Sequence, residues 1–244
     1  MKQALAAPLQ RIIQYIGEHG IVRSRDIEAI GFPRQYLVRL HRQGKLNRPA
    51  RGIYTLPDAD VTEHHSYAEV TKRVPQATVC LLSALVFHEI TTQSPASVWI
   101  ALSKGARTPA LASPSLRMVR LSGPSLTEGI DKHQVEGVTV RVYSAAKTVA
   151  DCFKFRNKIG LDIAIEALRD CLHQKKASVN EIYHYAKVCR VSNVIRPYIE
   201  ALYLGPDNAN IEMKTRRNRI LQTQSEECWP RMPAMHENRS AQAG

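Results

Sequence analysis

The sequence has no hydrophobic run that approaches the ~18 residues needed to cross a bilayer. Charged residues soon interrupt the apolar stretch in MKQALAAPLQRIIQYIGEHG, so we expect no secretory signal. No two cysteines form a CxxC pair, which argues against a zinc site and against a disulfide framework. The five cysteines lie far apart, at positions 80, 152, 171, 189 and 228. These absences predict a reduced, cytoplasmic protein without a membrane segment.

The sequence also lacks the signatures of common enzymes, including a P-loop, a G-x-G-x-x-G and a G-x-S-x-G. The D-x-D at Asp58–Asp60 has no upstream Gly-Ser loop, which polymerase-like nucleotidyltransferases need to hold a triphosphate. Asp207, Glu212 and Lys214 imitate the PD…ExK nuclease pattern, but they lie too close together to occupy neighbouring strands of a sheet. We therefore predict no enzyme activity, no cofactor and no metal site.

Acidic residues are scarce in the first quarter of the chain. Residues 1–55 carry ten basic and three acidic side chains, so their excess of seven is over half of the net charge of +12. A concentrated positive charge attracts polyanions, and its position on one segment is typical of a nucleic-acid-binding region. The charge distribution therefore identifies the N-terminal segment as the candidate nucleic-acid-binding region.

The N-terminal segment shows the spacing of three short helices followed by a hairpin. Ser24 is a suitable N-cap for the second helix, Pro33 suits the first turn of the third, and Gly44 ends it. The order of these pieces is that of a winged helix-turn-helix. The expected helices are 9–16, 25–30 and 34–43, and the hairpin begins at Leu46, turns at 48–52 and returns over 53–55.

The outer face of the third helix and the hairpin are arginine-rich. In a helix-turn-helix the second helix of the motif lies in the major groove, where arginine matches guanine and glutamine matches adenine. The hairpin would contact the DNA backbone or the minor groove. An arginine-rich surface can also be merely solvated, and a winged fold can bind a protein instead of DNA. The predicted DNA contacts are Arg34, Gln35, Tyr36, Arg39, Arg42, Arg48 and Arg51, with Arg23 and Arg25 ahead of them.

The remaining sequence predicts an α+β region that ends in a helical layer. Ser178 and Glu181 form a capping box ahead of the third helix of that layer, and Glu136-Gly137 suits a hairpin turn. The predicted fold class is α+β, with an N-terminal winged helix-turn-helix. The expected domains are 1–56 for DNA binding, 57–204 for the α+β and helical part, and 205–244 as a flexible polar tail. The expected elements are helices over 64–73 and 78–90, strands over 98–102 and 118–121, a hairpin over 133–143, and helices over 146–156, 161–174, 179–188 and 194–203.

Three stretches occur in a familiar order: RQGKLNRPARGIYTLPDAD, TVCLLSALVFHEITTQSPASVWIALS and VYSAAKTVADCFKFRNKIGLDIAIEALRDCL. Together they resemble the AbiEi family, the winged-helix antitoxins of the AbiE abortive-infection system, from about Leu9 to Leu204. The resemblance implies a bacterial type IV toxin–antitoxin system that acts in phage defence. It implies an N-terminal domain that binds inverted repeats of double-stranded DNA in its own promoter and represses the operon. It also implies a C-terminal region that counteracts a co-transcribed nucleotidyltransferase toxin.

Overall fold

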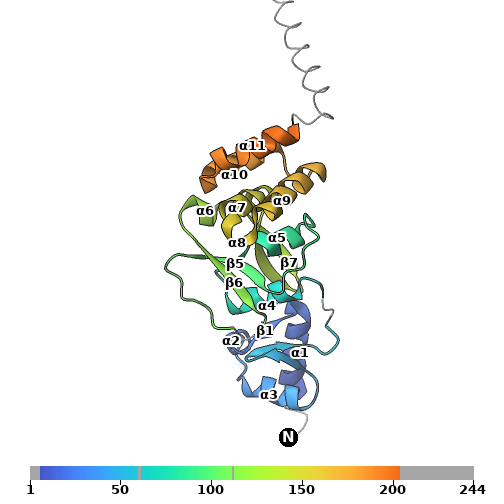
Figure 1. Ribbon diagram of the computed structural model, residues 1–244. Helices are drawn as coiled ribbons and strands as arrows, with labels where there is room; N and C mark the ends of the chain where they lie inside the picture. The colour runs from blue at the N-terminus through green and yellow to red at the C-terminus, as the bar shows by residue number, and fades with distance from the viewer. Residues whose placement is uncertain (1–5, 60–61, 112, 204–244) are drawn as a thin grey trace, which may run out of the picture. The chain divides into compact units, whose positions relative to one another are not determined.

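The computed structural model describes residues 6–59, 62–111 and 113–203, which form a mixed α+β structure (Figure 1). The contacts group the chain into two units, Met1–Ile199 and Glu200–Gly244. The predicted tail at 205–244, which contains the PD…ExK-like residues Asp207, Glu212 and Lys214, lies outside the described residues. Asp60 of the D-x-D also lies outside them.

The N-terminal part contains three helices and a small antiparallel sheet, near the positions that the sequence predicted. The strand order is β1-β3-β2, and β1 is too short to be recognised from a periodic pattern. The expected N-cap at Ser24 is wrong. Arg23 is the N-cap residue of α2 instead, and the backbone N–H of Arg23 donates a hydrogen bond of 2.9 Å to the Asp26 carboxylate. The elements are α1 (Ala6–His19), β1 (Val22–Arg23), α2 (Ser24–Ala29), α3 (Gln35–Arg42), β2 (Asn47–Ala50) and β3 (Ile53–Thr55).

A second sheet forms the centre of the chain, in the order β6-β5-β4-β8-β7. It is mixed, because β5 runs parallel to β6 and β4 runs parallel to β8, while the other two pairs are antiparallel. Glu136 and Gly137 form the predicted turn between β7 and β8, both with positive φ. The strands are β4 (Thr78–Val79), β5 (Val98–Ser103), β6 (Leu116–Leu121), β7 (Ile130–Val135) and β8 (Val138–Tyr143).

The predicted helix over 78–90 is wrong at its start, because Thr78 and Val79 form β4 in the middle of the sheet. A central strand and a buried helix are both apolar all round, so hydrophobic periodicity does not separate them. The β-branched side chains of these two residues favour the strand. The helix α5 is accordingly short, Leu81–Phe87.

Helices cover the second sheet and then pack on one another. α4 contacts β8, α5 contacts β5 and α7, and α7 contacts α9 and α10, which forms the predicted helical layer (Figure 1). The predicted capping box is confirmed, since Ser178 Oγ accepts from the Glu181 N–H and the Glu181 carboxylate accepts from the Ser178 N–H. The helices are α4 (His65–Arg73), α6 (Pro124–Thr127), α7 (Ala145–Lys154), α8 (Arg156–Ile159), α9 (Leu161–His173), α10 (Val179–Cys189) and α11 (Ser192–Tyr203).

The four cysteines in the described part of the chain are free and buried. Burial raises the pKa of Cys171 to about 11 and that of Cys189 to about 12. These thiols therefore remain protonated at neutral pH, as expected of structural cysteines.

The turn between β7 and β8 packs closely against the end of α1 and the segment before α4. A Cβ at Gly137 would lie 2.6 Å from the backbone carbonyl carbon of His19, so the two backbones touch. The Glu136 carboxylate accepts from the Thr62 N–H at 2.8 Å and lies 2.6 Å from Nδ1 of His65. This turn thus joins the N-terminal part to the second sheet.

Acid should weaken this junction. Burial alone raises the pKa of Glu136, but the hydrogen bonds from Thr62 and His65 outweigh it and hold the pKa below its usual 4.5. Since the carboxylate is more acidic in the folded state, its stabilisation is complete above the unfolded pKa and is lost as pH falls through the folded pKa. In urea unfolding from pH 7 to pH 3, Glu136→Gln should lower the free energy of unfolding by about 1–3 kcal/mol at pH 7 and flatten its decline in acid. A variant that keeps the full acid dependence would contradict this assignment.

Candidate nucleic-acid interface

α3 has one buried face and one charged face. Leu37 and Leu40 are fully buried and pack with Ile12, Ile16 and Ile27 of α1 and α2. Their spacing of three residues places them on one side of the helix, so the side chains between them face solvent.

The helix ends where the sequence predicted. Gly44 adopts a φ of +70°, and the N–H of Lys45 donates to the Leu40 carbonyl at 3.0 Å. Glycine adopts this left-handed conformation without strain. The chain then reverses toward the hairpin formed by β2 and β3.

The hairpin brings two more arginines beside α3. Gly52 supplies the positive φ of the turn, +77°. Pro49 lies on β2, which is an edge strand, so the N–H that proline lacks is not needed to pair with a second neighbouring strand. The Arg48 guanidinium carbon lies 5.9 Å from the centroid of the Tyr54 ring, which is buried. A cation–π contact of this kind orients the guanidinium itself, while Arg48 as a residue remains exposed.

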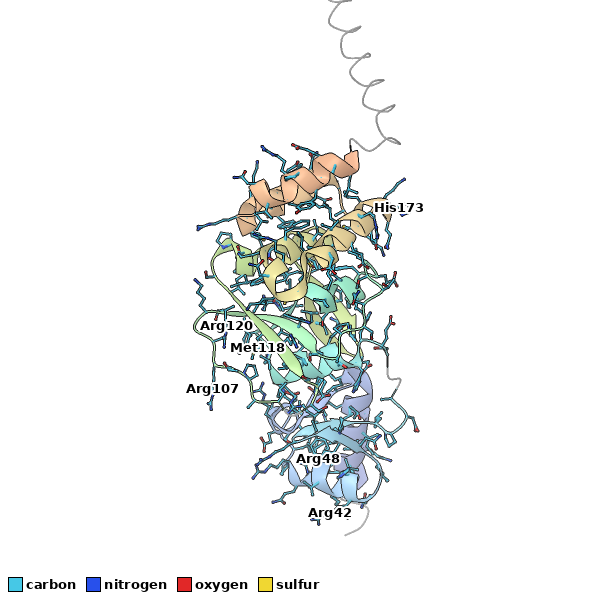
Figure 2. The ribbon with its side chains drawn as sticks, viewed as in Figure 1. Arg42, Arg48, Arg107, Met118, Arg120 and His173 are labelled. Carbon is cyan, nitrogen blue, oxygen red and sulfur yellow. The ribbon has the colours of Figure 1, made fainter. Side chains whose placement is uncertain are left out.

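α3 and the hairpin enclose a groove of about 890 Å³, which we call the arginine groove. No carboxylate of the described residues lines it, and its five arginines form no ion pair within residues 6–59, 62–111 and 113–203. Figure 2 labels Arg42 and Arg48 on this N-terminal part of the molecule. The arginine groove is lined by Ser24, Arg34, Gln35, Val38, Arg39, Arg42, Gln43, Arg48, Arg51, Gly52 and Tyr54.

The structure brings together six of the nine residues predicted to contact DNA. These six are exposed, so their side chains are accessible to a ligand. They are Arg34, Gln35, Arg39, Arg42, Arg48 and Arg51.

The other three predicted contacts lie outside the groove lining. Tyr36 is half-buried and packs edge-on against Phe32, so it is partly a core residue. Arg25 is exposed on α2. The guanidinium of Arg23 donates to Asp26 and to the Lys72 carbonyl. Its charge is therefore partly balanced by Asp26, which also lies 3.6 Å from Lys72, and a DNA contact by Arg23 stays a prediction.

Sequence reasoning missed Val38, which is 39% exposed in the middle of the groove. Its position four residues after Arg34 places it on the same helix face, and this spacing was the signal that could have identified it. A valine here adds an apolar contact between the charged side chains.

Two negative findings apply to the described residues. Within residues 6–59, 62–111 and 113–203 no helix is long and apolar enough to span a membrane. Within the same ranges no group of three or more His, Cys, Asp or Glu side chains is arranged to hold a metal ion.

Comparison with known proteins agrees with the resemblance seen in the sequence. The structure is similar to the crystal structure of the RV2827C protein from Mycobacterium tuberculosis, with a TM-score of 0.51, 13% identity and 80% of each chain covered, which shows a shared fold. Curated protein sequences give no significant match. Residues 10–57 match the family model described as "Transcriptional regulator, AbiEi antitoxin", and this range contains the whole arginine groove. The chain therefore carries, at residues 10–57, a transcriptional-regulator domain of the AbiEi antitoxin type.

Proposed function

We propose that residues 1–56 form a winged helix-turn-helix domain that binds double-stranded DNA and represses the chain's own operon. The observation that carries the proposal is the arginine groove, with five exposed arginines and no carboxylate of the described residues in its lining. Its place inside the range matched by the regulator family supports the same conclusion.

In this proposal α3 enters the major groove. Arg34 and Arg39 would read guanine through the paired acceptors O6 and N7, and Gln35 would read adenine. Val38 lies among them and suits the methyl group of thymine. These contacts would provide sequence specificity.

The hairpin would supply contacts of a different kind. Arg48 and Arg51 lie at the edge of the groove, on the strand and the turn. Arginines placed there neutralise phosphates, which fixes the register of the protein on DNA but does not distinguish bases. Inverted repeats would then be bound by two copies of the chain, since a palindromic operator matches a two-fold axis.

The rest of the chain, residues 57–204, is proposed to counteract a co-transcribed nucleotidyltransferase toxin. This part of the proposal rests on the antitoxin description of the matched family and on the sequence resemblance. Co-expression with the neighbouring nucleotidyltransferase gene tests it. Growth should be restored by the full chain, and continued growth arrest would contradict an antitoxin role.

The DNA-binding proposal is tested by a gel shift with the DNA upstream of the gene and with an unrelated duplex of equal length. The full chain should retard the upstream duplex at lower concentration. Arg48→Ala should weaken binding to both duplexes alike and reduce the salt slope by about one, because a phosphate contact is lost.

Arg11→Ala is the matched control, since Arg11 is exposed on α1 and does not line the groove. It should bind both duplexes nearly as the wild type does. Equal affinity of wild type for both duplexes, or no shift at all, would favour the alternative that the winged fold binds a protein instead of DNA.

A further inference from the structure

A second basic cavity, far along the chain from the arginine groove, has a volume of about 870 Å³. We call it the basic pocket. It is assembled from the ends of β5 and β6, the start of α6, and helices α7, α8, α10 and α11. Six basic side chains line it, against one carboxylate, Glu128: they are Lys104, Arg120, Lys154, Arg156, Lys187 and Arg190.

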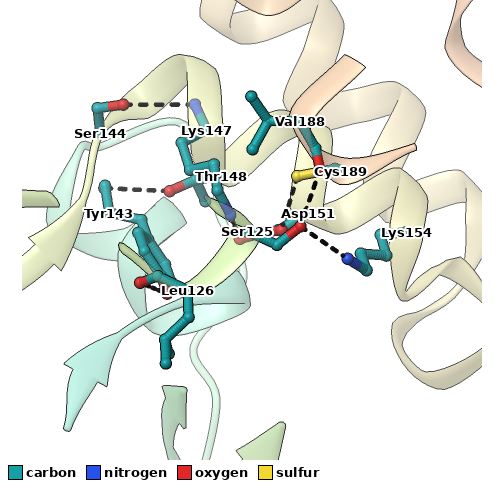
Figure 3. A network of polar contacts seen from close by, with 10 residues as sticks. All are labelled: Ser125, Leu126, Tyr143, Ser144, Lys147, Thr148, Asp151, Lys154, Val188 and Cys189. Carbon is teal, nitrogen blue, oxygen red and sulfur yellow. Dashed lines mark hydrogen bonds and ion pairs between the residues drawn. The ribbon is translucent and has the colours of Figure 1, made fainter. Parts of the chain in front are cut away.

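Three of these cations are fixed by the protein itself. Arg120 donates to the Ser103 and Ala106 carbonyls, and Arg156 donates to the Phe153 carbonyl. Lys154 Nζ donates to Ser125 Oγ at 3.2 Å, and Figure 3 shows this pair beside Cys189, which also lines the pocket. The oxygens that accept hydrogen bonds from these three side chains are carbonyl and hydroxyl oxygens, which are neutral, so the contacts do not cancel the positive charges.

The other three cations have no bonded partner. The side chains of Lys104, Lys187 and Arg190 make no hydrogen bond or ion pair with any residue in 6–59, 62–111 or 113–203. Glu128 lies 3.7 Å from His184, a residue that does not line the pocket. Like charges gathered in one cavity repel one another, and a bound polyanion would relieve that repulsion.

Arg190 adds a second observation, because it follows α10 in the left-handed conformation, with φ 60° and ψ 43°. This position favours glycine, and a side chain there is strained. The backbone conformation does not select arginine, and Arg190 nevertheless places a cation in the lining of the pocket.

We propose that the basic pocket binds a small polyphosphate of the nucleoside triphosphate class. The volume is within the range of small-ligand sites, roughly 300–1,000 Å³, and six cations suit a ligand with several negative charges. Leu121, Val191 and Val194 provide apolar lining for a base. The inference does not depend on the proposed DNA binding, since none of the residues that line the basic pocket lines the arginine groove.

The test is isothermal titration calorimetry of the full chain with ATP and with inorganic tripolyphosphate, at 150 mM salt. We expect ATP to bind with a dissociation constant on the order of 10–100 μM. Arg190→Gly should weaken binding about tenfold while the melting temperature stays equal or rises, because glycine relieves the left-handed backbone. A loss of ATP affinity at an equal or higher melting temperature would therefore not be caused by a folding defect.

Lys175→Gly is the matched control. Lys175 is also an exposed cation in the left-handed conformation after a helix, with φ 55°, but it does not line the pocket. It should keep wild-type affinity, and so should Arg39→Ala, which alters only the arginine groove. Absence of ATP binding, or an equal loss in the Arg190 and Lys175 variants, would overturn the proposal. It would also fail if an unrelated DNA duplex bound with the same Arg190 dependence while ATP did not bind.

Discussion

Replacing Arg34 and Arg39 together by alanine is expected to reduce specific binding to the upstream DNA by about 2–6 kcal/mol. Each arginine that reads a guanine contributes about 1–3 kcal/mol of discrimination, and the two exposed side chains line the same groove, Arg34 at the N-cap of α3 and Arg39 within it. Binding to an unrelated duplex should fall much less, because base reading contributes little there. Fluorescence anisotropy at fixed salt measures both affinities.

The structure predicts that this double substitution leaves the fold undisturbed. Neither arginine has an ion pair or side-chain hydrogen bond to the described residues, so their removal leaves no buried partner behind. The melting temperature of the double variant should therefore match that of the wild type. If both duplexes lost affinity equally, these arginines would be phosphate contacts, and α3 would not read the sequence.

The second large effect is on stability, at a buried ion pair in α7. Lys147 Nζ lies 2.5 Å from the Asp151 carboxylate, and the two side chains are 0% and 1% exposed (Figure 3). The ammonium also lies 4.2 Å from the centroid of the Tyr143 ring, and Cys189 Sγ donates to the same carboxylate at 3.2 Å. Asp151→Ala would leave a buried ammonium without its counter-charge, which costs about 3–5 kcal/mol.

Urea unfolding with two further variants checks this expectation. Lys147→Met combined with Asp151→Leu should recover most of the loss, since apolar residues of similar volume replace a buried pair at little cost. Lys176→Ala, which breaks the exposed pair with Glu89, should change the free energy of unfolding by less than about 1 kcal/mol. A loss below about 1 kcal/mol for Asp151→Ala would contradict the expected cost. A double variant no more stable than the single one would show that the loss does not come from the unpaired ammonium.

The sequence predicted best where local signals are strong. Gly44 and the Glu136-Gly137 turn mark the boundaries of elements, because their backbone preferences act without help from distant residues. Pro33 was predicted in the first turn of α3 but lies one residue before its N-cap, Arg34. The buried positions of α3 follow from helical periodicity for the same reason. Most of the arginine groove was therefore accessible from the sequence.

Contacts between distant segments were not accessible in this way. Arg23 donates to the Lys72 carbonyl, 49 residues away, and no local pattern reveals that contact, although the i,i+3 spacing to Asp26 was visible in the sequence. The strand at Thr78–Val79 depends on neighbours from β5 and β8. The basic pocket combines residues from Lys104 to Val194, which only the folded chain brings together.

The most direct test of the central claim, that the arginine groove binds duplex DNA, is the salt dependence of binding to the upstream duplex. Five exposed arginines line the groove, and each phosphate neutralised contributes about −0.9 to the slope of log K against log salt. For the full chain we predict preferential binding of the upstream duplex with a slope between about −3 and −5. A slope near zero, or no preference for the upstream duplex at any salt concentration, would contradict the account.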